Sequence, residues 1–180
     1  SIQLTSSTGE KLEIKDLVIS IDIYESLMSP YIKVELGISD AANFLETAPI
    51  VGQEKVDMVI TEGGKKIKKT FYVASVANYL RANNQASMYT LKLITPEQMM
   101  NSLLLVSQSF SGTIDESIDK IVTDYLKSKI AKKDKSVGNY SVIVPNWNPF
   151  QAIDWLTRRA INTKKMPYAF YETWKEGFMF

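Results

Sequence analysis

The chain has 180 residues, of which 45% are hydrophobic and 23% are charged, as in an ordinary globular protein. Its 21 basic and 20 acidic residues leave a net charge of +1, without the basic excess of a dedicated duplex-DNA binder. The sequence contains neither Cys nor His, which excludes thiol nucleophiles, Ser-His-Asp catalysis and zinc sites built from these residues.

Five segments in the first 95 residues alternate between apolar and polar side chains. This period of two predicts half-buried antiparallel strands, and five such strands predict a β-barrel or a β-sandwich. In the first segment, Ile19, Ile21 and Ile23 share one face, and Ser20 and Asp22 lie on the other. The segments are LVISIDIYESL (17–27), YIKVELGISD (31–40), KVDMVIT (55–61), KKTFYVASV (68–76) and MYTLKLI (88–94). We therefore expect residues 1–95 to form a first antiparallel β-barrel domain.

From Pro96 onward the period changes from strand-like to helical. The segment TIDESIDKIVTDYLKSKI (113–130) has apolar residues at every third or fourth position, which predicts an amphipathic helix. Thr113 and Glu116 have the spacing of a capping box at its start. We expect residues 96–166 to form a mixed, helix-rich connecting region.

A second helix is predicted within VPNWNPFQAIDWLTRRAI (144–161). Asn148 is a good N-cap residue, and Pro149 has the fixed φ angle that suits the first helical position. The last segment, YAFYETWKEGFMF (168–180), predicts a hairpin whose second strand is cut short. We expect residues 167–180 to start a second β domain and the natural chain to continue beyond Phe180, because an isolated hairpin is only marginally stable.

The sequence offers no convincing catalytic group, and we expect no enzymatic activity, no cofactor and no metal. No apolar run approaches the roughly 20 residues of a membrane span, so no membrane insertion is expected. Arg158 and Arg159 are adjacent on the second predicted helix, and the arginine fork grips carboxylates well. We therefore predict Arg158 and Arg159 as inter-subunit contacts.

Two other groups of side chains allow alternative interpretations. Four lysines in KKIKK (65–69) are consistent with a solvated hairpin or with contacts to phosphate. Trp147, Trp155 and Trp174 are consistent with core residues or with a stacking platform for glycans. Carboxylate pairs such as Asp115 and Asp119 would serve a glycoside hydrolase only if they faced each other across a cleft.

Taken in order, several segments resemble the baseplate hub proteins of contractile phage tails. The segments are IYESLMSPYIKVELGISDAANFLETAPIVGQEKVDMVI, FYVASV, YTLKLITPEQMMN, VSQSFSGTIDESIDKIVTDYL, VPNWNPFQAIDWLTRRAI and YAFYETWKEGFMF, and the resemblance covers essentially the whole chain. The same fold forms the N-terminal part of type VI secretion spike proteins.

The resemblance implies an α+β, mainly β fold with a tube-protein-like barrel, and a homotrimeric hub that joins the hexameric tail tube to the trimeric spike. The implied partners are the tail tube protein, the spike and other baseplate proteins, with DNA only as transiting cargo. The implied location is the virion tail, assembled in the host bacterial cytoplasm. A hub domain of a type VI secretion or tailocin spike is one alternative, and a glycan-binding β module is an alternative of another class.

Overall fold

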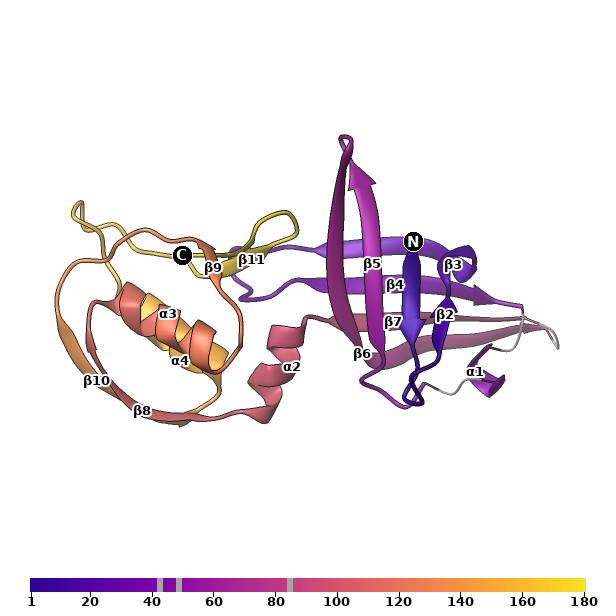
Figure 1. Cartoon of the computed structure of the whole chain (residues 1–180), viewed down its shortest axis with the longest axis horizontal. Coiled ribbons are helices and arrows are strands. Elements are labelled where there is room, and N and C mark those ends of the chain that lie inside the picture. The colour runs from indigo at the N-terminus through magenta and orange to yellow at the C-terminus, as the bar shows by residue number, and fades with distance from the viewer. Residues whose placement is uncertain (42–43, 48–49, 84–85) are drawn as a thin grey trace. The chain divides into compact units, whose positions relative to one another are not determined.

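The computed structural model of the chain describes residues 1–41, 44–47, 50–83 and 86–180 (Figure 1). The fold is α+β and mainly β, as predicted. The chain divides into two compact units. Unit 1 comprises Ser1–Tyr24 and Lys33–Pro96, and unit 2 comprises Glu25–Ile32 and Glu97–Phe180.

Unit 1 contains one antiparallel sheet of seven strands in the order β2-β1-β5-β6-β7-β4-β3. The strands are β1 (Ile2–Thr5), β2 (Lys11–Glu13), β3 (Val18–Tyr24), β4 (Lys33–Asp40), β5 (Lys55–Glu62), β6 (Lys65–Asn83) and β7 (Ala86–Ile94), with a 3-10 helix η1 (Lys15–Leu17) and a short helix α1 (Phe44–Thr47). No pairing among the described residues joins β2 to β3, so the sheet is open. The predicted alternation does not identify β1 and β2, because strands of four and three residues show almost no period.

The core of unit 1 lies on one face of this sheet. Along β4 and β7 every second side chain is buried, which is the alternation predicted from the sequence. The strand residues buried on this face include Ile2, Leu4, Val34, Leu36, Ile38, Val56, Met58, Phe71, Val73, Leu91 and Leu93.

β3 departs from the half-buried strand that the sequence predicts. Ile19, Ile21 and Ile23 are 59%, 40% and 36% exposed. Ile21 pairs with Leu36 of β4, and Ile23 pairs with Val34, so both isoleucines lie on the core face of the sheet. They are exposed because β3 is the last strand of the sheet.

Unit 2 combines three helices, a two-stranded ribbon and a three-stranded sheet. The elements are α2 (Pro96–Leu103), β8 (Val106–Gly112), α3 (Ile114–Asp124), β9 (Ile130–Lys132), β10 (Tyr140–Trp147), α4 (Pro149–Thr157), β11 (Tyr171–Thr173) and β12 (Gly177–Met179). β8 and β10 form a curved antiparallel ribbon, and α3 and α4 pack against each other on its concave side (Figure 1). β11 and β12 form the predicted hairpin, and β9 pairs in parallel with β12.

The core of unit 2 is built from α3, α4, both sheets and part of the connection between β3 and β4. Its buried residues include Val106, Phe110, Ile114, Ile118, Ile121, Val122, Leu126, Val144, Phe150, Ile153, Leu156, Phe170 and Phe178. The ring of Tyr31 stacks on Phe150 with centroids 5.8 Å apart. Glu172 Oε2 accepts a hydrogen bond of 3.1 Å from the backbone N–H of Ile32, and Glu25 Oε1 accepts one from the backbone N–H of Trp174. These contacts attach residues 25–32 to unit 2.

The helix predicted over residues 113–130 ends earlier, at Asp124. Its start agrees with the prediction, since Glu116 Oε2 accepts a 3.3 Å hydrogen bond from the backbone N–H of Thr113. At the other end, Lys127 has a φ of 53°, which stops the helix and turns the chain toward β9. The backbone N–H of Ser128 then donates to the carbonyl of Val122 at 3.2 Å.

The start of α4 is capped by a residue from another helix. Asn148 occupies the N-cap position and Pro149 follows it, as predicted, but the Asn148 side chain makes no capping hydrogen bond. It donates instead to the carbonyl of Asn101 in α2 at 2.9 Å. Asn101 Oδ1 in turn accepts a 2.8 Å hydrogen bond from the backbone N–H of Phe150. The predicted cap position is therefore right, and the predicted capping side chain is wrong.

Candidate assembly surfaces

Arg158 and Arg159 lie at the exposed end of α4 in unit 2. The Arg158 guanidinium contacts Asp154 at 2.9 and 3.0 Å, and both side chains are exposed, by 73% and 61%. Arg159 donates to the carbonyl of Trp155 at 2.8 Å, and its guanidinium carbon lies 3.8 Å from the centroid of the Trp155 ring. Both arginines thus contact their own helix while remaining at the surface.

The three tryptophans do not form a flat platform. Trp174 is only 6% exposed. Trp147 and Trp155 are half-buried and meet edge to face, with centroids 5.5 Å apart, and Arg159 covers the Trp155 ring. A glycan-stacking surface needs open ring faces, and here Trp174 is buried and Arg159 covers one face of Trp155.

Asp115 and Asp119, the carboxylate pair noted in the sequence, both contact other side chains in unit 2. Asp115 is buried, and its Oδ1 accepts hydrogen bonds from Ser136 Oγ at 2.7 Å and from the Ser136 backbone N–H at 3.1 Å. Burial raises the pKa of Asp115, but the hydrogen bonds from Ser136 outweigh it and leave this pKa below its usual value. Asp119 forms a 2.9 Å ion pair with Lys133. These contacts explain both carboxylates without catalysis.

Among the described residues, no group of three or more Asp or Glu side chains is placed to hold a metal ion. In the same part of the chain, no helix is long and apolar enough to cross a membrane.

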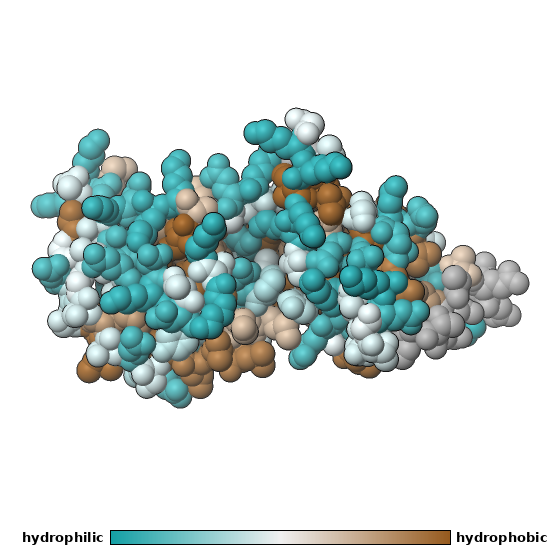
Figure 2. Space-filling view, in the orientation of Figure 1, coloured by the Kyte–Doolittle hydropathy of each residue, from teal (hydrophilic) through white to brown (hydrophobic). Residues whose placement is uncertain are grey.

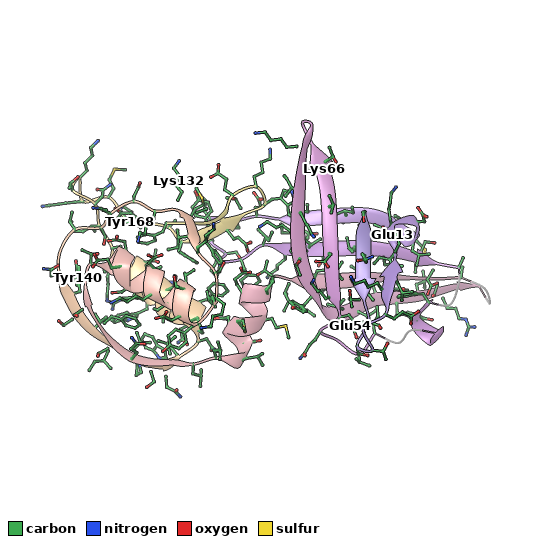
Figure 3. All side chains as sticks on the ribbon, in the orientation of Figure 1. Glu13, Glu54, Lys66, Lys132, Tyr140 and Tyr168 are labelled. Carbon is green, nitrogen blue, oxygen red and sulfur yellow. The ribbon has the colours of Figure 1, made fainter. Side chains whose placement is uncertain are left out.

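The lysine-rich segment forms a two-stranded arm, which we define as residues 60–69 at the tip of the β5–β6 hairpin. β1 pairs with β5 only over Lys55–Met58, and β7 pairs with β6 only from Tyr72 onward. In the described part of the chain, no strand flanks the arm on either side. Figure 1 shows its tip extending beyond the other strands of unit 1, and Figure 3 places Lys66 near this tip.

The arm carries both charge and apolar surface. Lys65, Lys66 and Lys68 are exposed. Ile60 and Ile67 pair with each other across the two strands and are half-buried. In Figure 2, hydrophobic surface lies just below the hydrophilic residues of the tip.

The β3 edge, which we define as residues 18–24, is the second exposed feature of unit 1. On the face opposite its isoleucines, Asp22 pairs with Glu35 of β4, so two carboxylates lie side by side. The charge of Glu35, together with burial and the charge of Asp22, raises the pKa of the Tyr24 hydroxyl. The alternation in the sequence identified this strand but not its exposure.

The fold is similar to those of tail and secretion proteins. The 43 kDa tail protein of prophage MuSo2 from Shewanella oneidensis matches 88% of this chain and 47% of its own at 16% identity, with a TM-score of 0.58. A tail protein from Neisseria meningitidis matches 87% of this chain and 44% of its own at 14% identity, with a TM-score of 0.51. An Escherichia coli type VI secretion component, described as similar to the T4 tail proteins gp27 and gp5, matches 83% and 43% at 13% identity, with a TM-score of 0.51.

These matches confirm the predicted resemblance at the level of the fold. The chain spans less than half the length of each of these three structures. The sequence itself matches no protein-family model and no curated protein.

Proposed function

We propose that this chain is a structural component of a phage tail baseplate, where three copies form the central hub between the tail tube and the spike. The observation that carries this proposal is the similarity of fold, over 83–88% of the chain, to two tail proteins and one secretion component. A hub acts by binding its neighbours and by leaving a channel for DNA. The net charge of +1 suits a channel that DNA passes through without being held.

The hub adapts the hexameric tube to the trimeric spike and carries no catalytic group. Its partners are the tube protein, the spike protein and other baseplate proteins. The chain assembles in the host cytoplasm and resides in the virion tail, without membrane insertion. A second β domain, beginning within residues 167–180, belongs to this proposal.

The solution mass of the chain tests the proposal. Light scattering of the whole natural protein over a hundredfold range of concentrations should give a mass three times that of one of its chains, with dissociation only at the dilute end. A monomer at every concentration would contradict the hub. Immunogold labelling of purified tails is the second measurement, and label at the baseplate end is expected.

Arg158 and Arg159 are proposed contacts between subunits of the hub. Replacing both by Ala should shift the mass from trimer toward monomer and leave the unfolding free energy nearly unchanged, since an exposed ion pair contributes about 0–1 kcal/mol. Lys164→Ala and Lys165→Ala, on the loop that follows α4, form a matched control that should leave the mass unchanged. A trimer that persists without both arginines would remove them from the interface.

A hub domain of a type VI secretion or tailocin spike is the second candidate, and the similarity to the secretion component favours it. Both candidates are trimers, so the solution mass does not distinguish them. The location of the protein in the particle distinguishes them. Label on secretion spikes or on headless tail particles, and none on virions, would favour this second candidate.

A further inference from the structure

Residues 25–32, which we call the strap, connect β3 to β4 but belong to unit 2. Tyr24 and Lys33, which flank the strap, pair directly with each other across β3 and β4. The chain therefore leaves the unit 1 sheet, contributes eight residues to unit 2 and returns to the neighbouring strand of the same sheet. One further link, after Pro96, connects the two units along the chain.

Unit 2 holds the strap at both of its ends. At the first end, Glu25 accepts a hydrogen bond from the backbone N–H of Trp174. At the second end, Ile32 is completely buried, and its backbone N–H donates to Glu172 at 3.1 Å. The ring of Tyr31 packs against the core of unit 2 beside this bond. The strap is therefore fixed in unit 2 at the two points where it leaves and re-enters the unit 1 sheet.

β3 has little else to hold it on the unit 1 sheet. It is the last strand, so it pairs with β4 alone, and Ile19, Ile21 and Ile23 remain exposed on it. A strand with few buried contacts and with hydrogen bonds along one side only opens more easily than strands inside a sheet. A fixed strap keeps the ends of β3 and β4 together, whereas a free loop of the same length has to be closed at an entropic cost.

We propose that the strap couples the pairing of β3 with β4 to the packing of unit 2. While unit 2 holds the strap, the ends of both strands stay side by side and β3 stays paired. When the strap leaves unit 2, β3 loses this support and separates from β4 more often. Because coupling between two equilibria is reciprocal, a chain whose β3 has separated also holds its strap in unit 2 less firmly.

Amide hydrogen exchange of the whole chain, followed by NMR, measures the pairing of β3 directly. Tyr31→Ala removes a ring of the strap from the core of unit 2 and leaves β3 and β4 unchanged. The backbone amides of β3 should then exchange at least about fivefold faster than in the original chain. Amides of β2, at the other edge of the sheet, should exchange as before. An unchanged rate in β3 would refute the coupling.

Tyr140→Ala is the matched control. Tyr140 is a half-buried tyrosine of β10 that packs against the same core of unit 2, and it contributes to none of the strap contacts given above. Its replacement should leave exchange in β3 unchanged. Equal acceleration by Tyr31→Ala and Tyr140→Ala would assign the effect to a general loss of stability in unit 2 and overturn the inference. Glu25→Ala removes the acceptor at the other end of the strap and should act as Tyr31→Ala does.

The reverse effect is the second test. Ile23→Gly weakens β3 close to the strap, because glycine adds chain entropy and removes a side chain from the strand. The amides of Ile32 and Trp174 donate the hydrogen bonds that hold the strap, and both should then exchange at least about fivefold faster. Leu12→Gly on β2 is the control and should leave both amides unchanged. Unchanged exchange in the Ile23 variant would contradict a coupling that has to act in both directions.

A disulfide across the ends of the strap tests how the effect is transmitted. Tyr24 and Lys33 are directly paired, and such partners in antiparallel strands lie within the Cα distance that a disulfide allows. The chain has no cysteine of its own, so Tyr24→Cys with Lys33→Cys supplies the only thiols. In the oxidised chain, Tyr31→Ala should no longer accelerate exchange in β3, and reduction should restore the acceleration. Acceleration that persists in the oxidised chain would refute transmission through the ends of the strap.

These outcomes are independent of the proposed hub, because the strap and its contacts lie within one chain. Unchanged exchange rates in the Tyr31 and Ile23 variants would refute the coupling and leave the hub standing. A monomeric whole protein would contradict the hub, and accelerated exchange in the same sample would still support the coupling.

Discussion

At the residue scale, side chains from distant elements hold unit 2 together. Asn101 of α2 caps α4, and Ser136 satisfies the carboxylate of Asp115 in α3. Each contact links positions more than 20 residues apart in the sequence. Removing the Asn101 side chain leaves the backbone N–H of Phe150 without its acceptor, and removing the Ser136 hydroxyl takes a donor from the buried carboxylate of Asp115. Either change lowers the free energy of unfolding.

Asn101→Ala should lower the unfolding free energy by about 1–2 kcal/mol, because the backbone N–H of Phe150 loses its acceptor at the start of α4. Urea unfolding followed by tryptophan fluorescence measures this change. Ser102→Ala is the matched control, since Ser102 Oγ is exposed and bonds only within its own helix. Equal losses for both variants would show that the capping contact contributes nothing specific.

Asp115→Asn should lower stability at pH 7 by about 1–3 kcal/mol, since a charge-assisted hydrogen bond from buried Ser136 is weakened. The folded-state pKa of Asp115 is lowered from its unfolded value of about 3.9, so the unfolded chain binds more protons between these two values. The contribution of Asp115 is therefore complete above that unfolded value and is lost as the pH falls through the folded pKa.

Urea unfolding at a series of pH values from 7 to 2 tests this sign. The original chain should lose stability on acidification, and the Asp115→Asn chain should lose less. Asp119→Asn removes an exposed ion pair and should change stability by no more than about 1 kcal/mol. An unchanged acid dependence in the Asp115 variant would disprove the assignment.

At the element scale, the sequence predicted where strands and helices begin better than where they end. The capping spacing of Thr113 and Glu116 is local, so it was visible in the sequence. The end of α3 was not visible in the sequence, because Lys127 takes a left-handed conformation that is sterically unfavourable for lysine. Here the turn leads into β9, which pairs with a strand about 50 residues later.

Lys127→Gly should raise the unfolding free energy by about 0.5–1 kcal/mol, because glycine adopts a φ of 53° without the steric cost that lysine bears. Thermal unfolding followed by circular dichroism measures the gain. Lys129→Gly is the control, since Lys129 has no positive φ and should lose stability through added chain entropy. A loss at both positions would contradict the proposed role of Lys127.

At the scale of the whole molecule, the chain separates into two units with their own cores. All three tryptophans lie in unit 2, so their fluorescence reports on that unit, whereas circular dichroism reports on both. Residues 25–32 belong to unit 2 although they connect two strands of unit 1. No local pattern in this connection predicted that assignment.

Ile118→Ala should shift the fluorescence transition by about 2–5 kcal/mol, since Ile118 is fully buried in unit 2. Leu91→Ala in unit 1 should cost a similar amount by circular dichroism and move the fluorescence transition much less. Coincident shifts in both probes for both variants would show that the two units unfold as one.

The sequence by itself determined the mainly β class, most of the strands of unit 1, the starts of α3 and α4 and the final hairpin. These features depend on alternation, helical period and capping spacing, which act between neighbours along the chain. It also supported the resemblance that the shared fold confirms, whereas the inter-subunit role of Arg158 and Arg159 stays a prediction.

Only the tertiary structure decided which strand lies at the edge of the sheet, and hence that Ile19, Ile21 and Ile23 are exposed. The same holds for the unflanked arm and for the capping of α4 by Asn101. Alternation divides a strand into two faces, but burial depends on what packs against each face. That neighbour comes from elsewhere in the chain, so the local pattern does not reveal it.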